Sequence, residues 1–417
     1  MSKQADSSNA FEEQASVPAE EQVPAEEQES QSSVELDYQE EERPQESESL
    51  KILRVASDVY PEVMGGLSLH VHEMSRLQAE WGHDVTVLTS DHGNRDLPRE
   101  EERDGYELIR HREIASPLDN TIAPGLVKQV WDMAEDYDVI HAHSHLFFST
   151  NAAAALGRAL DVPLVVTNHG LMSQTAPEWV QRAFVPTVAK FTLESADKVL
   201  CYTETDKRRL RERGIDTNVG IVHNGIDCEK FAPGKATTIG GLQILFVGRL
   251  KPGKGASDLL TAFEDVVAEF PETTLKIVGD GPLRDDLMEK ANKNGIDSNV
   301  DFVGQVSNDE MPKIYAESDI FTLPSLNEGL PRTVLEAMAC EIPVVVSDLE
   351  QLAPVVDGAG VRVERQSPNE LASKLLELLA NDNQRAHMGA VGRQKVLENY
   401  SWQETVRETS AEYHQLV

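Results

Sequence analysis

The sequence predicts an α/β protein with two Rossmann-like, doubly wound domains that face a cleft, preceded by a disordered acidic tail. Three observations lead to this fold class. The chain has 417 residues, more than one hydrophobic core usually serves. Short apolar strand patterns alternate with helical patterns, which is typical of a parallel sheet covered on both faces. The alternation stops at a stretch rich in Gly, Pro and Thr, FAPGKATTIGG, and then begins again.

Residues 1–49 form the predicted tail. They consist mainly of Glu, Gln, Ser, Pro and Ala, with few residues that a core would bury. Such a segment cannot offset the entropy lost on ordering, so we expect it to be disordered. Order is expected to begin at Leu50, with the apolar segment LKILRVASD.

The N-terminal Rossmann-like domain is predicted over residues 50–232. Its first strand leads into a turn at Gly65 and Gly66, which is followed by a helical apolar pattern. The later predicted strands have the sequences DVTVLTS (84–90), DVIHA (138–142), PLVVT (163–167) and ADKVLCYT (197–203).

The C-terminal Rossmann-like domain is predicted over residues 233–399. A last helix follows from about Ser401, a suitable N-cap with Glu404 three residues later. The predicted strands of this domain are QILFVG (243–248), TLKIVG (274–279), VDFVG (300–304), DIFTLP (319–324) and IPVVVS (342–347).

The composition narrows the classes of partner. The formal net charge is −34, and the first 50 residues hold only 2 basic and 15 acidic residues of 38 and 72, so the acidity is not confined to the tail. Such a surface repels nucleic acid and anionic lipid, which argues against nucleic acid as a partner. A host with a salt-rich cytoplasm and an ordinary acidic cytosolic protein both fit this charge.

The cysteines and the apolar runs indicate a cytoplasmic protein. Cys201, Cys228 and Cys340 are scattered and form no CxxC pair, which is typical of reduced thiols. No signal-peptide pattern and no apolar run of membrane-spanning length occurs. Any membrane contact is therefore expected to be peripheral, at the inner face.

The segment SLNEGLPRTVLEAMA, which begins at Ser325, places two carboxylates around a helix start. Gly329 allows close backbone approach to a ligand, and Pro331 suits a first helical position. The free N–H groups of the helix start, near Thr333, favour a phosphate. Glu328 in the loop and Glu336 one turn inside the helix could each accept hydrogen bonds from sugar hydroxyls. Taken alone, the same pattern also fits two solvated charges at a helix start.

The segment GRLKPGKG, after the strand QILFVG, gathers three cations in an otherwise acidic chain. Arg249 and Lys254 are positioned to clamp a diphosphate and to neutralise charge on a leaving nucleotide. The GK[ST] ending of a nucleotide-triphosphate loop is missing, because Gly255 and Ala256 follow Lys254. A solvated basic turn is the less favoured interpretation.

Histidines gather near strand ends of the first domain. His141, His143 and His145 alternate at the end of one strand, and His169 follows another. An HxHxH pattern could hold a metal, but the nearby acidic residues have no ligand spacing, so packing or polar lining is favoured and no metal is predicted.

A helical pattern runs through Trp179, Phe184, Val185, Val188 and Phe191. Its spacing fits a core-facing helix, which is the favoured interpretation, and it also fits an apolar acceptor groove or a membrane contact.

Together these segments resemble the retaining GT-B glycosyltransferases called glycosyl transferase group 1, which are glycosyltransferase family 4-like. The resemblance covers about residues 51–417, and its most specific element is the E-x7-E pattern of Glu328 and Glu336. The supporting motifs are GGL at 65–67, HAH at 141–143, TNHG at 167–170, HNGID at 223–227, GRLKPGKG at 248–255 and VGDGPL at 278–283. One departure is Arg332, where many relatives carry a small or apolar residue.

The resemblance implies a role for each matching position. It implies that the first domain lies on the acceptor side and that the helix at 400–417 returns to it. It also implies a reaction without a bound metal that keeps the anomeric configuration, by same-face attack in which the departing phosphate helps to deprotonate the acceptor. Arg249 and Lys254 are implied to hold the donor diphosphate, Gly65 and Gly66 to lie near the phosphates, and Glu336 to bind the ribose. Glu328, together with the backbone of Gly329 and Leu330, is implied to orient the donor sugar, with His169 beside that sugar. The base is implied to lie against the loop of Val303 to Gln305.

The expected function is therefore transfer of a hexosyl unit from a nucleoside-diphosphate sugar to a glycan, lipid-linked or small-molecule acceptor. Two alternatives stay open at this point. One is a nucleotide-sugar epimerase or hydrolase with the same fold, and the other is a sugar-nucleotide-binding protein without catalysis.

Overall fold

The computed structural model describes residues 48–171, 177–234 and 241–417. The predicted disordered tail, apart from its last two residues, lies outside the described residues, and so does most of the predicted linker. Within the described ranges the chain forms two sheets, one of eight strands and one of six. The predicted fold class of two Rossmann-like α/β domains is confirmed.

The first sheet has the order β3-β4-β2-β1-β5-β6-β7-β8 and is parallel except for the edge pair of β3 and β4. Its five predicted strands match β1, β2, β5, β6 and β7 closely. The elements of this half are β1 Lys51–Val55, α1 Gly66–Glu80, β2 Asp84–Ser90, β3 Glu100–Arg103, β4 Tyr106–His111, η1 Pro117–Asp119, α2 Pro124–Met133, η2 Ala134–Asp136, β5 Val139–His143, α3 Phe148–Gly157, β6 Leu164–Asn168, α4 Glu178–Phe184, the π-helix η3 Val185–Ala189, α5 Lys190–Glu194, β7 Lys198–Cys201, α6 Glu204–Glu212 and β8 Val219–Ile221.

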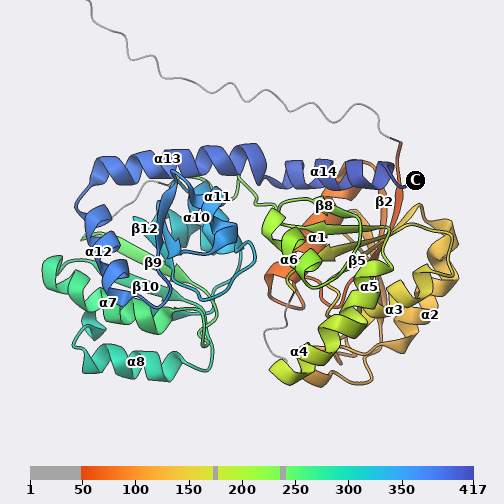
Figure 1. Ribbon diagram of the computed structural model, residues 1–417, viewed down its shortest axis with the longest axis horizontal. Coiled ribbons are helices and arrows are strands. Elements are labelled where there is room, and N and C mark those ends of the chain that lie inside the picture. Colours follow the sequence, from red (N-terminus) through yellow and green to blue (C-terminus); the bar gives the residue numbers. More distant parts are fainter. Residues whose placement is uncertain (1–47, 172–176, 235–240) are drawn as a thin grey trace, which may run out of the picture. The chain divides into compact units, whose positions relative to one another are not determined.

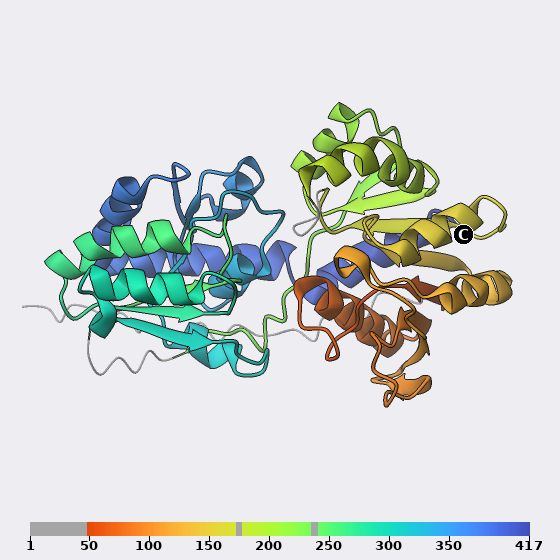
Figure 2. The ribbon, with the colours of Figure 1, turned by 90° about the horizontal axis from the view of Figure 1, so that it is seen from below.

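The second sheet has the order β11-β10-β9-β12-β13-β14, and all its pairings are parallel. Figures 1 and 2 show α7 and α8 on one side of this sheet and α13 on the other. The elements are β9 Gln243–Val247, α7 Ala256–Glu269, β10 Thr274–Val278, α8 Arg284–Lys293, η4 Asp297–Asn299, β11 Val300–Gly304, α9 Met311–Ala316, β12 Ile320–Leu323, α10 Arg332–Ala339, β13 Val344–Ser347, η5 Glu350–Leu352, α11 Ala353–Val356, β14 Gly360–Val363, α12 Pro368–Leu379, α13 Asp382–Asn399 and α14 Trp402–His414.

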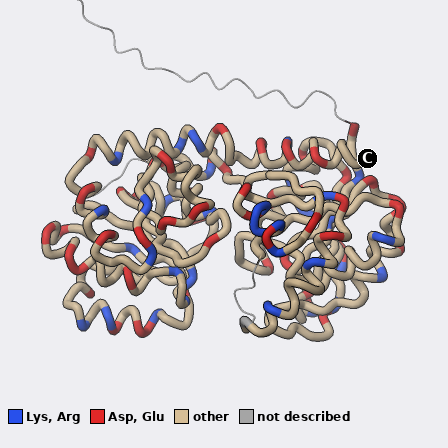
Figure 3. Tube along the Cα trace, in the orientation of Figure 1, with Lys and Arg blue, Asp and Glu red and all other residues tan. Residues whose placement is uncertain are grey.

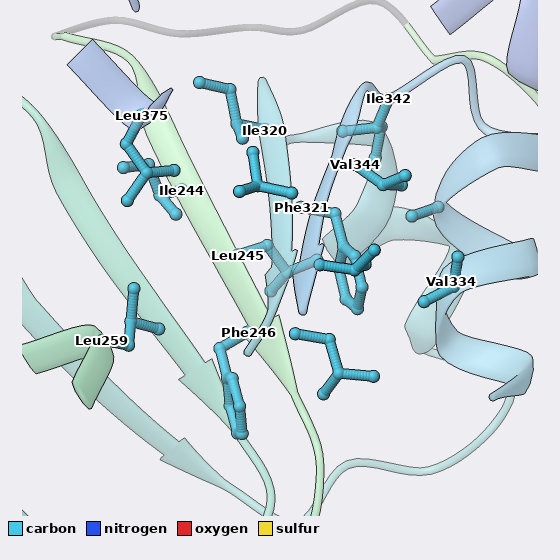
Figure 4. Close-up of a cluster of buried hydrophobic side chains, with 14 of the residues drawn as sticks. Ile244, Leu245, Phe246, Leu259, Ile320, Phe321, Val334, Ile342, Val344 and Leu375 are labelled. Carbon is cyan, nitrogen blue, oxygen red and sulfur yellow. The ribbon is translucent and has the colours of Figure 1, made fainter. Parts of the chain in front are cut away.

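The core of the second half explains why its strands read as continuous apolar runs. Ile244, Leu245 and Phe246 of β9 are fully buried, and successive side chains of a strand point to opposite faces. Figure 4 shows them with Ile320 and Phe321 of the neighbouring strand β12. Both faces of the sheet are therefore covered, which leaves the strand ends as the places for polar ligands.

Helix α14 packs on helix α1 of the first half. Trp402 and Val406 of α14 form a buried cluster with Met74 and Leu77 of α1. Ser401 is the N-cap, and its hydroxyl accepts from the N–H of Glu404 at 3.2 Å, which confirms the predicted helix start. The predicted domain boundaries themselves stay a prediction.

The two chain segments that pass from one sheet to the other lie side by side. The N–H of Ile226 donates to the carbonyl of Tyr400 at 2.8 Å, and the N–H of Trp402 donates to the carbonyl of Ile226 at 3.1 Å.

Figure 3 shows that acidic residues are distributed over both halves of the described chain, as the charge count of the sequence predicts.

A carboxylate network anchors the loop that carries Gly65. Glu62 binds Arg103 and Arg110, with Oε1 at 2.6 Å from one guanidinium nitrogen of each. Burial alone would raise the pKa of Glu62, but the hydrogen bonds and charge of the two arginines outweigh it and hold this pKa at about 2. The network ties the loop after β1 to the β3–β4 hairpin.

We expect Glu62→Gln to lower the free energy of unfolding by about 3 kcal/mol at pH 7, because it leaves Arg103 and the buried Arg110 without this carboxylate. The pKa of Glu62 is lower in the folded state than in the unfolded state, so ionised Glu62 stabilises the fold above pH 4.5. This stabilisation is lost as the pH falls towards 2. The difference between wild type and variant, measured by urea denaturation, should therefore shrink between pH 7 and about pH 3.5. The exposed Glu100→Gln on β3 is the matched control, and an equal loss in both variants would contradict the assignment.

Candidate active site

Two loops meet at the switch point of the second sheet. β9 and β12 are neighbours, and the chain winds outward from them in opposite directions. In such sheets the loops that leave these two strands at their carboxyl ends enclose the ligand site. One loop is GRLKPGKG after β9, and the other is SLNEGLP after β12.

Gly255 explains how closely the two loops approach. Its φ is +79°, and a Cβ added there would lie 2.0 Å from the carbonyl oxygen of Pro324. Any other residue would therefore push the first loop away from the end of β12. The N–H of Leu326 donates to the carbonyl of Gly253 at 2.8 Å and joins the loops.

The contact brings Lys254 and Glu328 together. The Lys254 Nζ lies 2.6 Å from the Glu328 Oε1, and the two side chains are only 17% and 7% exposed. The Gln351 side-chain amide donates to the backbone carbonyl of Glu328 and fixes this loop from a third segment. The structure thus holds a shielded cation and carboxylate at the sheet edge.

Glu336, one turn inside α10, is held by two neighbours. The Tyr315 hydroxyl donates to Glu336 Oε2 at 2.8 Å, and an Arg332 nitrogen lies 3.6 Å from Glu336 Oε1. Burial and the nearby carboxylate raise the pKa of Tyr315 well above its usual value, so the phenol keeps its proton and donates. Glu336 is therefore an oriented, buried carboxylate.

Arg332 connects the Glu336 carboxylate to the two chain segments that pass between the sheets. Its guanidinium donates to the carbonyl of Gly225 at 2.9 Å and lies over the Trp402 ring, 5.4 Å from a ring centroid. The predicted departure at position 332 thus has a structural role, which the sequence pattern did not indicate.

Two cavities hold most of the predicted donor contacts. A cavity of about 680 Å³ has Gly65, Gly66, Arg249, Thr333 and Glu336 in its wall. A cavity of about 500 Å³ has His169, Lys254, Glu328 and Gly329 in its wall. A Cβ added to Gly329 would meet no atom within 4 Å, so space lies in front of its backbone.

Four other predicted site residues do not line either cavity. Leu330 is buried, and Pro331 is the N-cap of α10 instead of its first helical residue. Val303 and Gly304 do not line either cavity, whereas Gln305 and Val306 line the larger one. The proposed roles of all these residues stay predictions.

The histidines form a buried cluster that differs from the HxHxH expectation. His143 Nδ1 lies 3.1 Å from His169 Nε2, and His169 Nδ1 lies 2.7 Å from the Tyr202 hydroxyl. His141 instead contacts Thr167 and Tyr413. Burial lowers the pKa of His143 and His169 well below the usual value, so both rings are neutral near pH 7. Sequence reasoning missed Tyr202, because a tyrosine in a strand pattern looks like ordinary core.

The helix pattern from Trp179 to Phe191 is less buried than predicted. Trp179 is 74% exposed, and Val188 and Phe191 are each 40% exposed, while Val185 is buried. The expectation of a core-facing helix is therefore wrong for most of its apolar residues, because η3 interrupts the α-helical period between α4 and α5. Among the residues that the structure describes, no helix is long and apolar enough to cross a bilayer.

Family comparisons identify both halves of the chain. The family described as "Glycosyltransferase Family 4" matches residues 64–230, and the family described as "Glycosyl transferases group 1" matches residues 235–395. The chain belongs to the group 1 glycosyltransferases. The boundary between the two matches lies at the linker, so each half of this glycosyltransferase matches its own family model.

Curated relatives of this glycosyltransferase cover most of its length. The glycogen synthase of Mycobacterium tuberculosis is 28% identical over 397 residues, covering 87% of this chain and 94% of the relative. The D-inositol 3-phosphate glycosyltransferase of Rhodococcus jostii is 26% identical and covers 82% of each chain. These relatives therefore support a glycosyltransferase as the class of enzyme, and they do not identify its donor or acceptor.

Solved structures confirm that this glycosyltransferase has the GT-B fold. Sucrose-phosphate synthase from Thermosynechococcus elongatus aligns with a TM-score of 0.74 at 23% identity, over 88% of this chain and 99% of that one. Anabaena HepE, solved in complex with UDP-glucose, aligns with a TM-score of 0.71 at 19% identity, over 88% of this chain and all of that one. At these sequence identities the structural similarity is evidence for the fold alone.

Proposed function

We propose that this glycosyltransferase is a cytoplasmic, retaining enzyme that transfers a hexosyl unit from a nucleoside-diphosphate sugar. The acceptor is a glycan, a lipid-linked sugar or a small molecule. The observation that carries the proposal is the pairing of Lys254 with Glu328, beside the second carboxylate Glu336, at the switch point of the second sheet.

The donor would lie along the two cavities. Its ribose hydroxyls would donate hydrogen bonds to the Glu336 carboxylate, and its diphosphate would lie between Arg249 and Lys254. The sugar would then reach the smaller cavity, where Glu328 and His169 line the wall. This order places each charged group of the donor against a side chain of suitable chemistry.

The charge of the leaving diphosphate decides what the site must do. Negative charge grows on the phosphate as the bond to the sugar breaks, and preorganised cations stabilise it most where water is excluded. Lys254 is 17% exposed and already held in place by Glu328. The donor phosphate would share this ammonium with Glu328, which then accepts from the sugar hydroxyls. In this proposal no metal takes part, because Arg249, Lys254 and the α10 N-terminus carry the positive charge.

The ligands and activities named for similar proteins support this donor class. HepE was solved with UDP and with UDP-glucose, and the named relatives include a glycogen synthase and an inositol-phosphate glycosyltransferase. These names favour a nucleoside-diphosphate hexose and a hydroxyl-bearing acceptor. The base of the donor and the identity of the acceptor are left to experiment.

A thermal-shift screen against nucleoside-diphosphate sugars tests the proposal. A bound donor stabilises the folded state, so at least one donor should raise the melting temperature. Product analysis without acceptor then separates the alternatives, because an epimerase would convert the donor and a hydrolase would release free sugar. A donor that binds but is never consumed with a broad acceptor panel would favour a non-catalytic binding protein.

We expect Glu336→Gln to raise the donor KM about 10-fold or more, because hydrogen bonds to a charged group contribute about 1.5–3 kcal/mol. The kcat should change much less, since the ribose is remote from the bond that breaks. Initial rates over a range of donor concentrations measure both parameters. Glu341→Gln, just after α10, is the control, and an unchanged donor KM in Glu336→Gln would remove Glu336 from the site.

A further inference from the structure

We propose that His70, His143 and His169 form a binding site for a divalent transition-metal ion of the zinc class, an ion that takes no part in the transfer step itself. The three histidines come from α1, from the end of β5 and from the loop after β6. One ring nitrogen of each can be chosen so that all three lie within 4.8 Å of one another. Imidazole nitrogen is a preferred ligand of zinc and of its neighbours in the first transition series.

The geometry of the pair His143 and His169 fits two ligands of one ion. Their facing nitrogens, Nδ1 and Nε2, are 3.1 Å apart. Two ligands about 2.0–2.1 Å from a tetrahedral zinc ion are separated by about 3.4 Å. The third ring, that of His70, lies 5.6 Å and 5.1 Å from the other two by ring centroids. The chosen nitrogens lie within 4.8 Å of one another, so binding would draw the three rings together towards the spacing of about 3.4 Å in a tetrahedral site.

Outer contacts orient two of the ligands. His70 Nδ1 lies 3.1 Å from Asn224 Oδ1, an acceptor that fixes the proton on this nitrogen and leaves Nε2 with its lone pair free for a metal. His169 Nδ1 lies 2.7 Å from the Tyr202 hydroxyl. Metal-bound histidines commonly make such a bond with the second nitrogen, which holds the ring in the binding tautomer.

Burial and access also suit a metal. His70 is buried and its Nδ1 faces Asn224, so its Nε2 lone pair is available to an ion. His169 lines the cavity of about 500 Å³, which gives an ion a path from outside. Arg54 lies near the cluster and its positive charge opposes a second cation, so we expect micromolar affinity and not the tight binding of a structural zinc site.

Occupancy has a consequence for the proposed reaction. An ion held by His169 would place positive charge in the wall of the cavity proposed for the sugar, so zinc should inhibit transfer and a chelator should restore it. This consequence rests on the proposed function. Metal binding itself does not, and it can be measured without any donor or acceptor.

Cobalt(II) titration of chelator-treated protein is the test. Co²⁺ in a tetrahedral nitrogen site gives intense visible d–d bands, and we expect these bands to saturate at one ion per chain. His70→Gln and His143→Gln should each weaken Co²⁺ binding more than the loss of an outer contact, which costs about 10–100-fold. His387→Gln, an exposed histidine on α13, should leave the titration unchanged.

Asn224→Ala provides a further test in case the histidine variants fail to fold. It leaves all three ligands in place and should weaken Co²⁺ binding about 10–100-fold, with circular dichroism as the check of folding. Absence of visible bands at millimolar Co²⁺ would overturn the proposal. Bands that are unchanged in folded His70→Gln, His143→Gln and Asn224→Ala would place the ion elsewhere and would overturn it as well.

Discussion

Lys254→Ala should lower kcat/KM for the donor about 10³-fold, an effect comparable to the removal of a preorganised group that stabilises transition-state charge. The Lys254 ammonium is mostly buried and lies 2.6 Å from Glu328, so it needs no reorganisation as the diphosphate departs. Both kcat and donor binding should fall, because the same charge attracts the ground-state diphosphate. Steady-state kinetics together with calorimetric titration of the donor measure the two effects.

Stability must be separated from activity in this variant. Removing Lys254 leaves Glu328, which is 7% exposed, without its cation and should destabilise the fold. The double variant Lys254→Ala with Glu328→Gln removes both charges, so it should recover much of that stability while staying inactive. Lys293→Ala, a lysine on the surface of α8, should behave as wild type. A Lys254→Ala enzyme within about 10-fold of wild type would refute the role of this cation.

Glu328→Gln should lower kcat about 10²–10³-fold while the donor dissociation constant changes little. The amide keeps the size of the side chain but removes the charge that accepts from sugar hydroxyls and orients the ring. The loss also frees Lys254 for the diphosphate, so donor affinity should stay close to that of wild type. This pattern separates Glu328 from Lys254, whose loss weakens donor binding too.

The matched control is Glu289→Gln on the surface of α8, which should leave both parameters unchanged. If Glu328→Gln instead raised the donor dissociation constant by the same factor as it lowered kcat/KM, Glu328 would be a simple binding residue. An unchanged kcat would remove Glu328 from the reaction.

The sequence predicts the central strands of both sheets because burial on two faces demands continuous apolar runs. DVTVLTS and QILFVG are such runs, and they become β2 and β9. The hairpin of β3 and β4 escaped prediction, because EEER has no apolar residue and lies at an edge. Its signals are the turn dipeptide at Asp104 and Gly105 and the apolar residues of the second strand, YELIRH.

The two loops that form the candidate site could be predicted from the sequence. The contacts between their side chains could not. Lys254 and Glu328 are 74 residues apart, and only the strand order β9-β12 explains why they meet. The sequence gives no pair information of this kind, and a single histidine such as His70 has no spacing that marks it. Tyr315 was missed for the same reason. Arg332 was noted as a departure from the family pattern, but its contact with Glu336 was not predicted, because it depends on tertiary structure.

Incubation with anomerically ¹³C-labelled nucleoside-diphosphate hexoses and a panel of hydroxyl-bearing acceptors tests the central claim most directly. NMR of the labelled carbon follows donor, free sugar, epimer and product in one sample. We predict that one donor disappears only when an acceptor is present and that the product keeps the anomeric configuration of the donor. Conversion of the donor without acceptor, an inverted product, or no consumption of any donor would contradict it.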